Sequence, residues 1–301
     1  MRVQPQESHG IDPIVDALAR SVDALPETHR IGREDVPDPE ALERALEIYR
    51  AICFPGYFGP RSGGELDARG FLAEAARIFE HALAPQLARA IAAGGTMGQE
   101  ADGRAEGWCR QVLVATPEIR ALLAQDAKEA MVADPAARGL DEIILCYPGL
   151  QAMIAHRLAH ALHGLGVPLV PRMLAEIAHR RTGIDIHPGA RIGPGLFIDH
   201  GTGVVIGETT VIGRRCRIYQ GVTLGALTPE LDRGGRVERG QKRHPTLGDR
   251  VVVYAGATIL GGETVIGDDA TVNGGVFLVQ SVPAGSVAQA PRPEVVLKSR
   301  A

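Results

Sequence analysis

Three histidines lie in residues 184–301 of the 301-residue chain, at His187, His200 and His244. The ordinary pKa of histidine lies close to pH 7, so its imidazole can take a proton from a weakly acidic hydroxyl at neutral pH. His200 belongs to the segment 199–203 (DHGTG), in which it is followed by two glycines. A single histidine is commonly a turn or surface residue, and only the surrounding pattern makes His200 a candidate base.

A second group of histidines falls at His156, His160 and His163, which share one face of a predicted helix. That spacing suits metal ligands, but no nearby carboxylate or thiolate completes a coordination shell, so a structural role is favoured and no metal is expected. The cysteines lie far apart without a CxxC pair, which fits neither a disulfide framework nor a thiolate metal site. We expect reduced, buried thiols at Cys53, Cys109, Cys146 and Cys216.

Composition excludes several classes of protein. The net charge of −4 gives no extended basic surface for a phosphate backbone, so nucleic acid is not an expected partner. The first residues lack an apolar run, and no stretch approaches the roughly 18 apolar residues of a membrane span. We therefore expect a cytoplasmic protein without membrane contact. Its 45% hydrophobic residues are enough for a sizeable core.

The first half of the sequence has the periodicity of amphipathic helices. Apolar residues recur there at spacings of three and four, and Gly and Pro separate the runs. The stretch 54–64 (FPGYFGPRSGG) is too rich in such residues for regular structure and is expected to be a loop with locally packed aromatics. The predicted helices span 12–25, 39–52, 65–93, 106–132, 141–165 and 170–181.

The second half is a repeat, in which an aliphatic residue returns at every sixth position. Each six-residue unit gives one short strand and one turn, so three units close a triangular coil of about 18 residues. The phase slips by two residues at 199–203 and is lost over 225–246, a long break of the kind that is usually functional or disordered. The thirteen aliphatic positions are Ile186, Ile192, Ile198, Ile206, Ile212, Ile218, Leu224, Leu247, Val253, Ile259, Ile266, Val272 and Leu278.

This pattern divides the chain into parts. We expect a helical assembly domain over 1–183, a repeat domain over 184–283 that contains the loop 225–246, and a C-terminal tail over 284–301. Thirteen units correspond to roughly four coils. A prism this thin has flat, poorly covered faces and open sheet edges, so association of several copies is expected.

Four ordered motifs within the repeat carry a specific resemblance. They are 185–188 (DIHP), 199–209 (DHGTGVVIGET), 220–225 (QGVTLG) and 242–245 (KRHP). In this order they resemble the motifs of the serine O-acetyltransferases, a family of hexapeptide-repeat acyltransferases. The resemblance implies an α+β fold, with a helical N-terminal domain and a left-handed parallel β-helix. It also implies trimers or dimers of trimers, with active sites between neighbouring copies.

The resemblance assigns roles to six residues. His200 is the base that activates the serine hydroxyl, and Asp185 matches the carboxylate that orients the imidazole. Asp134 and Asp199 match the carboxylates that bind the substrate ammonium. Arg243 is a better candidate than Lys242 for the substrate carboxylate, because a guanidinium makes two parallel hydrogen bonds. His244 lies near the carboxylate or the hydroxyl of the substrate.

Acetyl-CoA is the co-substrate that the resemblance implies, although the chain has no phosphate-binding glycine loop. By position the pantetheine arm is assigned to Gly225, Ala226, Ala255 and Gly256. Lys298 and Arg292 are candidates for the phosphates, although exposed cations in a tail are the commoner explanation. The segment 288–293 (AQAPRP) departs from the family's usual step after the last coil.

The implied reaction is transfer of acetyl from acetyl-CoA to L-serine, with L-cysteine as an expected feedback inhibitor that shares serine's ammonium and carboxylate. The chain ends in Ala301 and not in the isoleucine through which many members bind O-acetylserine sulfhydrylase, so no stable complex of that type is expected. Alternatives are acetylation of another hydroxylated acceptor such as a sugar, a zinc-dependent carbonic-anhydrase-like β-helix, and a non-catalytic scaffold.

Overall fold

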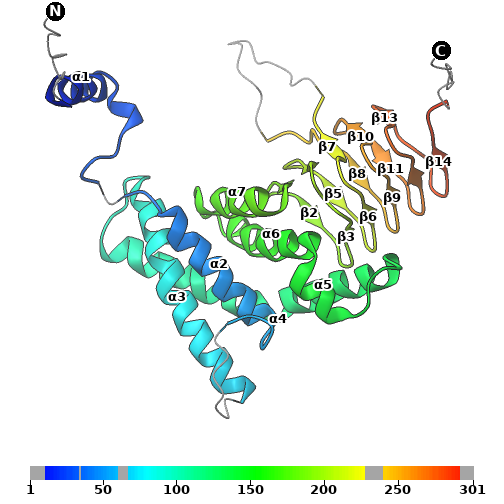
Figure 1. The fold of residues 1–301 in the computed structure, drawn as a ribbon, viewed down its shortest axis with the longest axis horizontal. Helices are drawn as coiled ribbons and strands as arrows, with labels where there is room; N and C mark the ends of the chain where they lie inside the picture. Colours follow the sequence, from blue (N-terminus) through cyan, green and yellow to red (C-terminus); the bar gives the residue numbers. More distant parts are fainter. Residues whose placement is uncertain (1–10, 34, 60–66, 228–239, 292–301) are drawn as a thin grey trace, which may run out of the picture.

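The computed structural model describes residues 11–33, 35–59, 67–227 and 240–291, and it combines a helical half with a parallel β-solenoid. In Figure 1 the helices occupy one side of the molecule and the short strands stack in rows on the other. The predicted combination of helices and a β-helix is confirmed. The first helix, α1 (Ile11–Ala24), lies apart from the other helices and buries no residue.

The helices follow the predicted periodicity with two differences. The run 141–165 is two helices, because Tyr147 adopts an extended backbone and Pro148 starts a new helix. The helix predicted from residue 106 begins earlier and continues through Pro117. After α1 and a short 3₁₀ turn (Pro26–Thr28) come α2 (Pro39–Cys53), α3 (Ala68–Ala92), α4 (Gln99–Ala133), α5 (Leu140–Cys146), α6 (Pro148–Gly164) and α7 (Val170–Thr182).

The solenoid consists of short parallel strands in three sheets, which form the three faces of a prism. The strand orders are β1-β4-β7-β10-β13, β2-β5-β8-β11 and β3-β6-β9-β12-β14, so each of the first four coils contributes one strand to each face. The strands are β1 (Ile184–Ile186), β2 (Arg191–Ile192), β3 (Phe197–Ile198), β4 (Val204–Ile206), β5 (Val211–Ile212), β6 (Arg217–Ile218), β7 (Thr223–Gly225), β8 (Thr246–Leu247), β9 (Val252–Val253), β10 (Thr258–Leu260), β11 (Val265–Ile266), β12 (Thr271–Val272), β13 (Phe277–Leu278) and β14 (Val287–Ala288).

The hexad pattern predicts the inside of the prism well. All thirteen aliphatic positions are buried, and they stack in register from coil to coil, as Ile206 does on Ile186 and Leu224. Four positions after most of them a small or apolar residue is also buried. The exceptions among the described residues are Thr202 and Glu263, which are exposed because the phase slips put Val204 and Thr264 inside instead. The strand β14 pairs with β12 and adds a unit beyond the thirteen.

A buried ion pair fastens the helical half to the first coil. Asp126 of α4 is 2% exposed, and its carboxylate accepts hydrogen bonds from the backbone N–H groups of Gly195 (2.8 Å) and Leu196 (2.9 Å). Arg157 of α6 lies 3.2 Å from the same carboxylate and donates to the carbonyls of Ile192 (2.6 Å) and Gly193 (2.9 Å). Two helices are thereby joined to the loop and strand that precede the phase slip.

The remaining expectations about loops and thiols are largely met. The aromatics of the described part of 54–64 do pack locally, since the rings of Phe54 and Tyr57 meet edge to face at 6.4 Å. All four cysteines are free thiols, but Cys146 is exposed and not buried, because it ends α5 on its outer side. No helix in the described ranges combines the length and apolarity needed to cross a bilayer.

The Asp126–Arg157 pair provides a test of how the two halves are held together. Asp126→Ala removes the partner of a buried guanidinium and the acceptor of two backbone N–H groups, and we expect it to cost about 3–5 kcal/mol in the free energy of unfolding. Urea denaturation measures this cost. Lys128→Ala, on the exposed side of the same helix, is the control and should change stability little. An unchanged unfolding midpoint for Asp126→Ala would contradict the assigned role.

Candidate functional site

His200 lies in the turn that leads into β4, at one corner of the prism. Its backbone has a left-handed φ of +56°, and its side chain is 71% exposed, with Nδ1 3.7 Å from Asp199 Oδ1. The next residue, Gly201, packs directly on β1, where an added Cβ would lie 2.4 Å from Ile184 Cδ1. The phase slip therefore folds the turn against the first coil and leaves the imidazole accessible. We call residues 199–203, 219–222 and 254–257 the His200 corner.

The helical half delivers a second carboxylate to the His200 corner. Asp134, just after α4, accepts hydrogen bonds from the Tyr147 hydroxyl (2.5 Å) and from the N–H of Ala136 (2.8 Å). These two bonds lower the pKa of the Asp134 carboxyl, and the proximity of His200 adds a smaller effect in the same direction. Asp134 therefore caps the end of α4 and anchors the turn that follows it. Its ionised carboxylate faces the same corner as Asp199 and His200.

Two tyrosines line the coils next to these carboxylates. Tyr219 follows β6 and Tyr254 follows β9, and their rings stack at 5.1 Å with an interplanar angle of 15°. Burial raises the pKa of Tyr219, and the nearby Asp199 and Asp134 raise it further, so its phenol stays neutral at ordinary pH. The corner thus combines two carboxylates, an imidazole and an aromatic wall.

The RHP motif forms a different cluster, at the opposite end of β4. His244 is buried, and its Nδ1 lies 3.1 Å from the backbone N of Thr209 and 2.9 Å from the hydroxyl of that residue. The same hydroxyl accepts hydrogen bonds from the N–H groups of Arg243 (2.9 Å) and His244 (3.0 Å). The imidazole ring of His244 lies over Gly207, where an added Cβ would be only 2.0 Å from Cδ2 of that ring. We call residues 187–190, 207–210 and 242–245 the His244 corner.

His244 is held as a neutral imidazole. Burial lowers its pKa to about 4, and the charges of Arg243 and Lys242 act in the same direction. Since the Thr209 amide donates to Nδ1, the neutral ring carries its proton on Nε2. His244 can therefore offer a hydrogen-bond donor at Nε2 at neutral pH, but it is a poor base there.

The two cations of the motif have different surroundings. The Lys242 ammonium donates to backbone carbonyls, including that of Thr209 at 2.7 Å, so it ties the loop to the coil. The Arg243 guanidinium is half-exposed and pairs with Glu208. Only one of its terminal nitrogens is used in that pair, which leaves donors for an incoming carboxylate. Binding of the substrate carboxylate by Arg243 and not by Lys242 stays a prediction.

Asp185 lies on β1, on the outer side of the sheet between the two corners. Its carboxylate is 3.4 Å from Arg172 of α7, and the described contacts of His200 include Asp199 but not Asp185. Asp185, Glu176 and His179 form the group of possible metal ligands found among the described residues. Arg172 contacts the carboxylates of both Glu176 and Asp185. His187, His200 and His244 do not form such a group there, nor do His156, His160 and His163.

The four residues assigned to acetyl-CoA fall at two corners of the prism. Ala255 and Gly256 lie in the His200 corner, where Gly256 has a φ of +69°. Gly225 is the last residue of β7, at the opposite end of the strands of this sheet, and Ala226 follows it. The phosphate candidates Arg292 and Lys298, the terminal Ala301 and most of the charged loop lie outside the described residues.

Sequence reasoning missed several residues that shape these corners. Tyr147, Thr209 and Glu208 make direct contacts with Asp134, His244 and Arg243. Glu208 and Thr209 are the last two residues of the motif 199–209, so their place in that motif was a signal that could have marked them as candidates. Tyr147 is 13 residues from Asp134, and nothing in the sequence indicates that α5 returns it to that carboxylate.

Known proteins resemble the chain over between more than half and nearly all of its length. A plasmid-encoded serine acetyltransferase of Synechococcus elongatus is 44% identical over 299 residues, which cover 95% of this chain and 92% of that protein. A serine acetyltransferase of Helicobacter pylori is 46% identical over 178 residues, covering 59% of this chain and 98% of the shorter relative. No protein-family profile matches the chain.

Solved structures give the same result. Isoform 3 of serine acetyltransferase from Entamoeba histolytica, in complex with cysteine, superimposes with a TM-score of 0.73 and 32% identity and covers 96% of both chains. The Neisseria gonorrhoeae serine acetyltransferase in complex with serine has a TM-score of 0.54 and 28% identity, covering 84% of this chain and 96% of that one.

The environment of His244 predicts an unusual titration. The imidazole of His244 becomes protonated near pH 6.5 in the unfolded chain but only near pH 4 in the folded chain. Protonation therefore favours the unfolded chain, and the fold loses stability as the pH falls from 6.5 to about 4. NMR of the ring nitrogens should show a neutral Nε2–H tautomer down to about pH 4. Gly207→Ala should displace the ring and move its pKa back toward the ordinary value. A wild-type pKa near the ordinary value would contradict the described packing.

Proposed function

The chain belongs to the serine acetyltransferase family, and from this premise we propose that it transfers the acetyl group of acetyl-CoA to the hydroxyl of L-serine. The observation that carries this proposal is the His200 corner, where an accessible imidazole lies beside Asp199 and near the ionised Asp134. The serine oxygen attacks the thioester carbonyl and His200 takes the hydroxyl proton. The C–S bond breaks, the thiolate recovers that proton, and O-acetyl-L-serine and CoA leave.

The base requires a carboxylate that stabilises the imidazolium formed during attack. We propose Asp185 for this role. Gly201 packs on Ile184, so the His200 turn and Asp185 are neighbours along β1. A rotation of the exposed imidazole away from Asp199 would direct one ring nitrogen to Asp185 and the other to the substrate. Asp199 would then be free to bind the ammonium.

The amino-acid part of serine needs groups of both signs. Asp134 and Asp199 supply negative charge for the ammonium, and Tyr147 keeps Asp134 ionised and oriented. Arg243 supplies a two-donor cation for the carboxylate, in competition with Glu208. The neutral Nε2–H of His244 adds a donor next to it. Two acidic residues and a guanidinium favour an amino acid over a sugar as acceptor.

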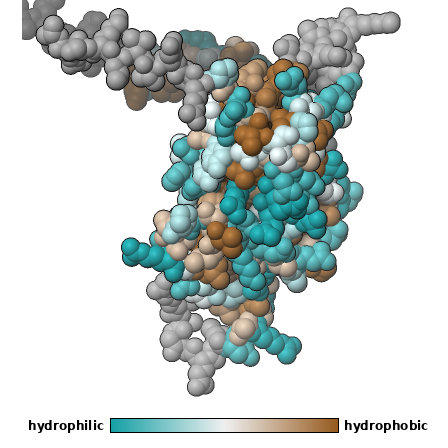
Figure 2. Space-filling model, turned by 90° about the vertical axis from the view of Figure 1, so that its right-hand side faces the viewer, coloured by the Kyte–Doolittle hydropathy of each residue, from teal (hydrophilic) through white to brown (hydrophobic). Residues whose placement is uncertain are grey.

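The two corners lie too far apart in one chain to hold one serine together. The three residues of β4 separate them, which at ~3.3 Å per residue is roughly 10 Å before the turns are counted. The sheet between them exposes apolar side chains, including Phe277 at 66% and Val205 at 37%. Figure 2 looks onto the C-terminal end of the solenoid, where hydrophobic patches also lie among hydrophilic side chains. We propose that copies associate around the solenoid, as a trimer or a dimer of trimers, so that each His200 corner faces a neighbour's His244 corner.

The same association explains the placement of the other assigned groups. It would bring Ala255 and Gly256 of one copy to Gly225 and Ala226 of the next, and so form a channel for the pantetheine arm. Residues 1–183 would brace the solenoid and extend the assembly. Cysteine carries serine's ammonium and carboxylate, and the Entamoeba relative is a cysteine complex, so feedback inhibition at this site is proposed. The unpaired thiols agree with a cytoplasmic location.

Removal of the base tests the reaction. His200→Ala should lower kcat for serine acetylation by about 10²- to 10⁴-fold, because general base assistance is worth that much. The oligomer mass should not change, since the side chain is exposed. His81→Ala, an exposed histidine of α3, is the control. Equal kcat in His200→Ala and the control would rule out His200 as the base, and a panel of sugar acceptors tests the alternative substrate class.

The hydrogen bond from Tyr147 tests the ammonium site. Tyr147→Phe leaves Asp134 with one donor fewer, so KM for serine should rise by about fivefold or more while KM for acetyl-CoA stays the same. Tyr57→Phe is a matched control, because Tyr57 makes the same kind of bond to Asp141 (2.6 Å) away from the corner. An unchanged KM for serine in Tyr147→Phe would show that Asp134 does not bind the ammonium.

A further inference from the structure

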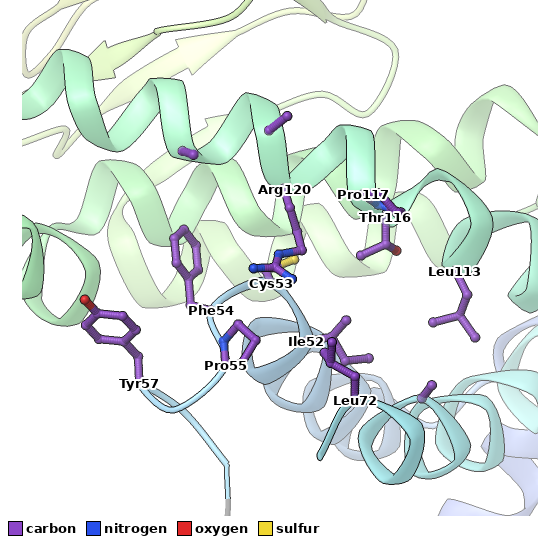
Figure 3. Close-up of a pocket in the computed structure, with 13 residues that line it drawn as sticks. Ile52, Cys53, Phe54, Pro55, Tyr57, Leu72, Leu113, Thr116, Pro117 and Arg120 are labelled. Atoms are coloured by element: carbon purple, nitrogen blue, oxygen red, sulfur yellow. The ribbon is translucent and has the colours of Figure 1, made fainter. Parts of the chain in front are cut away.

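The helical half contains a pocket that the proposed reaction does not use. It has a volume of about 770 Å³ and lies where the end of α2 and the following loop meet α3 and α4 (Figure 3). Such a volume is typical of small-molecule sites, which are mainly apolar with a few placed polar groups. The described lining residues are Ile52, Cys53, Phe54, Pro55, Tyr57, Leu72, Ala76, Leu113, Thr116, Pro117, Arg120, Ala121 and Ala124.

The pocket results from the residues that form its walls. Ala76 of α3 and Ala121 and Ala124 of α4 have side chains too short to fill the space between the helices. Pro117 lies inside α4 and has no N–H, so it cannot bond to the carbonyl of Leu113 on the same face of the helix. Small side chains and an interrupted helical ladder thus coincide at one place.

Arg120 is the charged side chain among these lining residues. In Figure 3 it extends from α4 toward Cys53 and the Phe54-Pro55 loop. No hydrogen bond or ion pair holds its guanidinium within the described residues. By contrast, Arg110, also on α4, pairs with Glu106 of α4 and with Glu80 of α3. An unpaired guanidinium over an apolar hollow is complementary to one anionic group on an apolar body.

Cys53 does not add covalent chemistry to this site. Burial raises the pKa of its thiol to about 12, and the nearby charge of Arg120 opposes that shift only in part. The thiolate is the reactive form of cysteine, so this thiol is inert at neutral pH. The polar contact that the pocket offers is therefore the reversible one at Arg120.

We propose that this pocket binds a small amphipathic monocarboxylate, with its carboxylate on Arg120 and its hydrocarbon part against the α2, α3 and α4 side chains. One guanidinium matches one carboxylate by two parallel hydrogen bonds, whereas a phosphate dianion needs more donors than the described walls provide. The site is separate from both corners of the solenoid. It is therefore a second ligand site, independent of the acetyl transfer reaction.

Isothermal titration calorimetry of the full chain with decanoate tests the proposal, and decan-1-ol is the neutral ligand of equal length. Saturable binding of one decanoate per chain is expected, and Arg120→Met should weaken it by about tenfold or more without affecting decan-1-ol. Ala121→Phe should fill the space and weaken both ligands. Arg110→Met, on the same helix but outside the pocket, is the matched control and should bind decanoate like the wild type.

Other outcomes overturn the proposal. They are the absence of saturable decanoate binding, equal binding by Arg120→Met and the wild type, or a change in oligomer mass with Ala121→Phe that shows a second copy in the pocket. Thermal unfolding confirms that each variant is folded. Serine acetylation by Arg120→Met should match the wild type, so failure of this proposal and failure of the proposed reaction can be told apart.

Discussion

The length of a strand in the solenoid determines where the chemistry can take place. Aliphatic side chains at every sixth residue fill the narrow interior, and the chain must turn after each short strand to return the next one inward. Polar residues are therefore confined to the turns, which stack at the corners. His200 and His244 stand at opposite ends of β4 for this reason, and neither corner alone offers both a base and a cation for a substrate carboxylate.

The helical half positions a carboxylate at the His200 corner. Asp126 and Arg157 tie α4 and α6 to the first coil, and Glu129 of α4 pairs with Arg217 on β6. This rigid attachment brings the end of α4, and with it Asp134, to the His200 corner. A residue with no place in the repeat thus joins the site, and its ionisation is set by Tyr147 from the end of the following helix.

The sequence was sufficient for the elements that repeat and for the motifs that lie in the turns. The thirteen buried aliphatic positions follow from their period, and the position of His200 in a distorted turn follows from the phase slip. Contacts between distant segments were not predictable, because nothing local encodes them. Arg243 illustrates the limit: its type indicated an anion ligand, but its pairing with Glu208 depends on how one coil lies on the next. The break in the helical run at Tyr147 is different, because Pro148 encodes it locally by disfavouring a helical backbone at the residue before it, and the periodicity alone did not register that signal.

Subunit complementation tests most directly whether the two corners act across an interface. His200→Ala and Arg243→Ala chains, each nearly inactive alone, are produced together so that they form mixed oligomers. If each site combines the His200 corner of one copy with the His244 corner of another, mixed oligomers contain some intact sites and recover a substantial fraction of wild-type serine acetylation. Activity no higher than the sum of the two parent variants would show that each chain carries a complete site and would contradict the shared one.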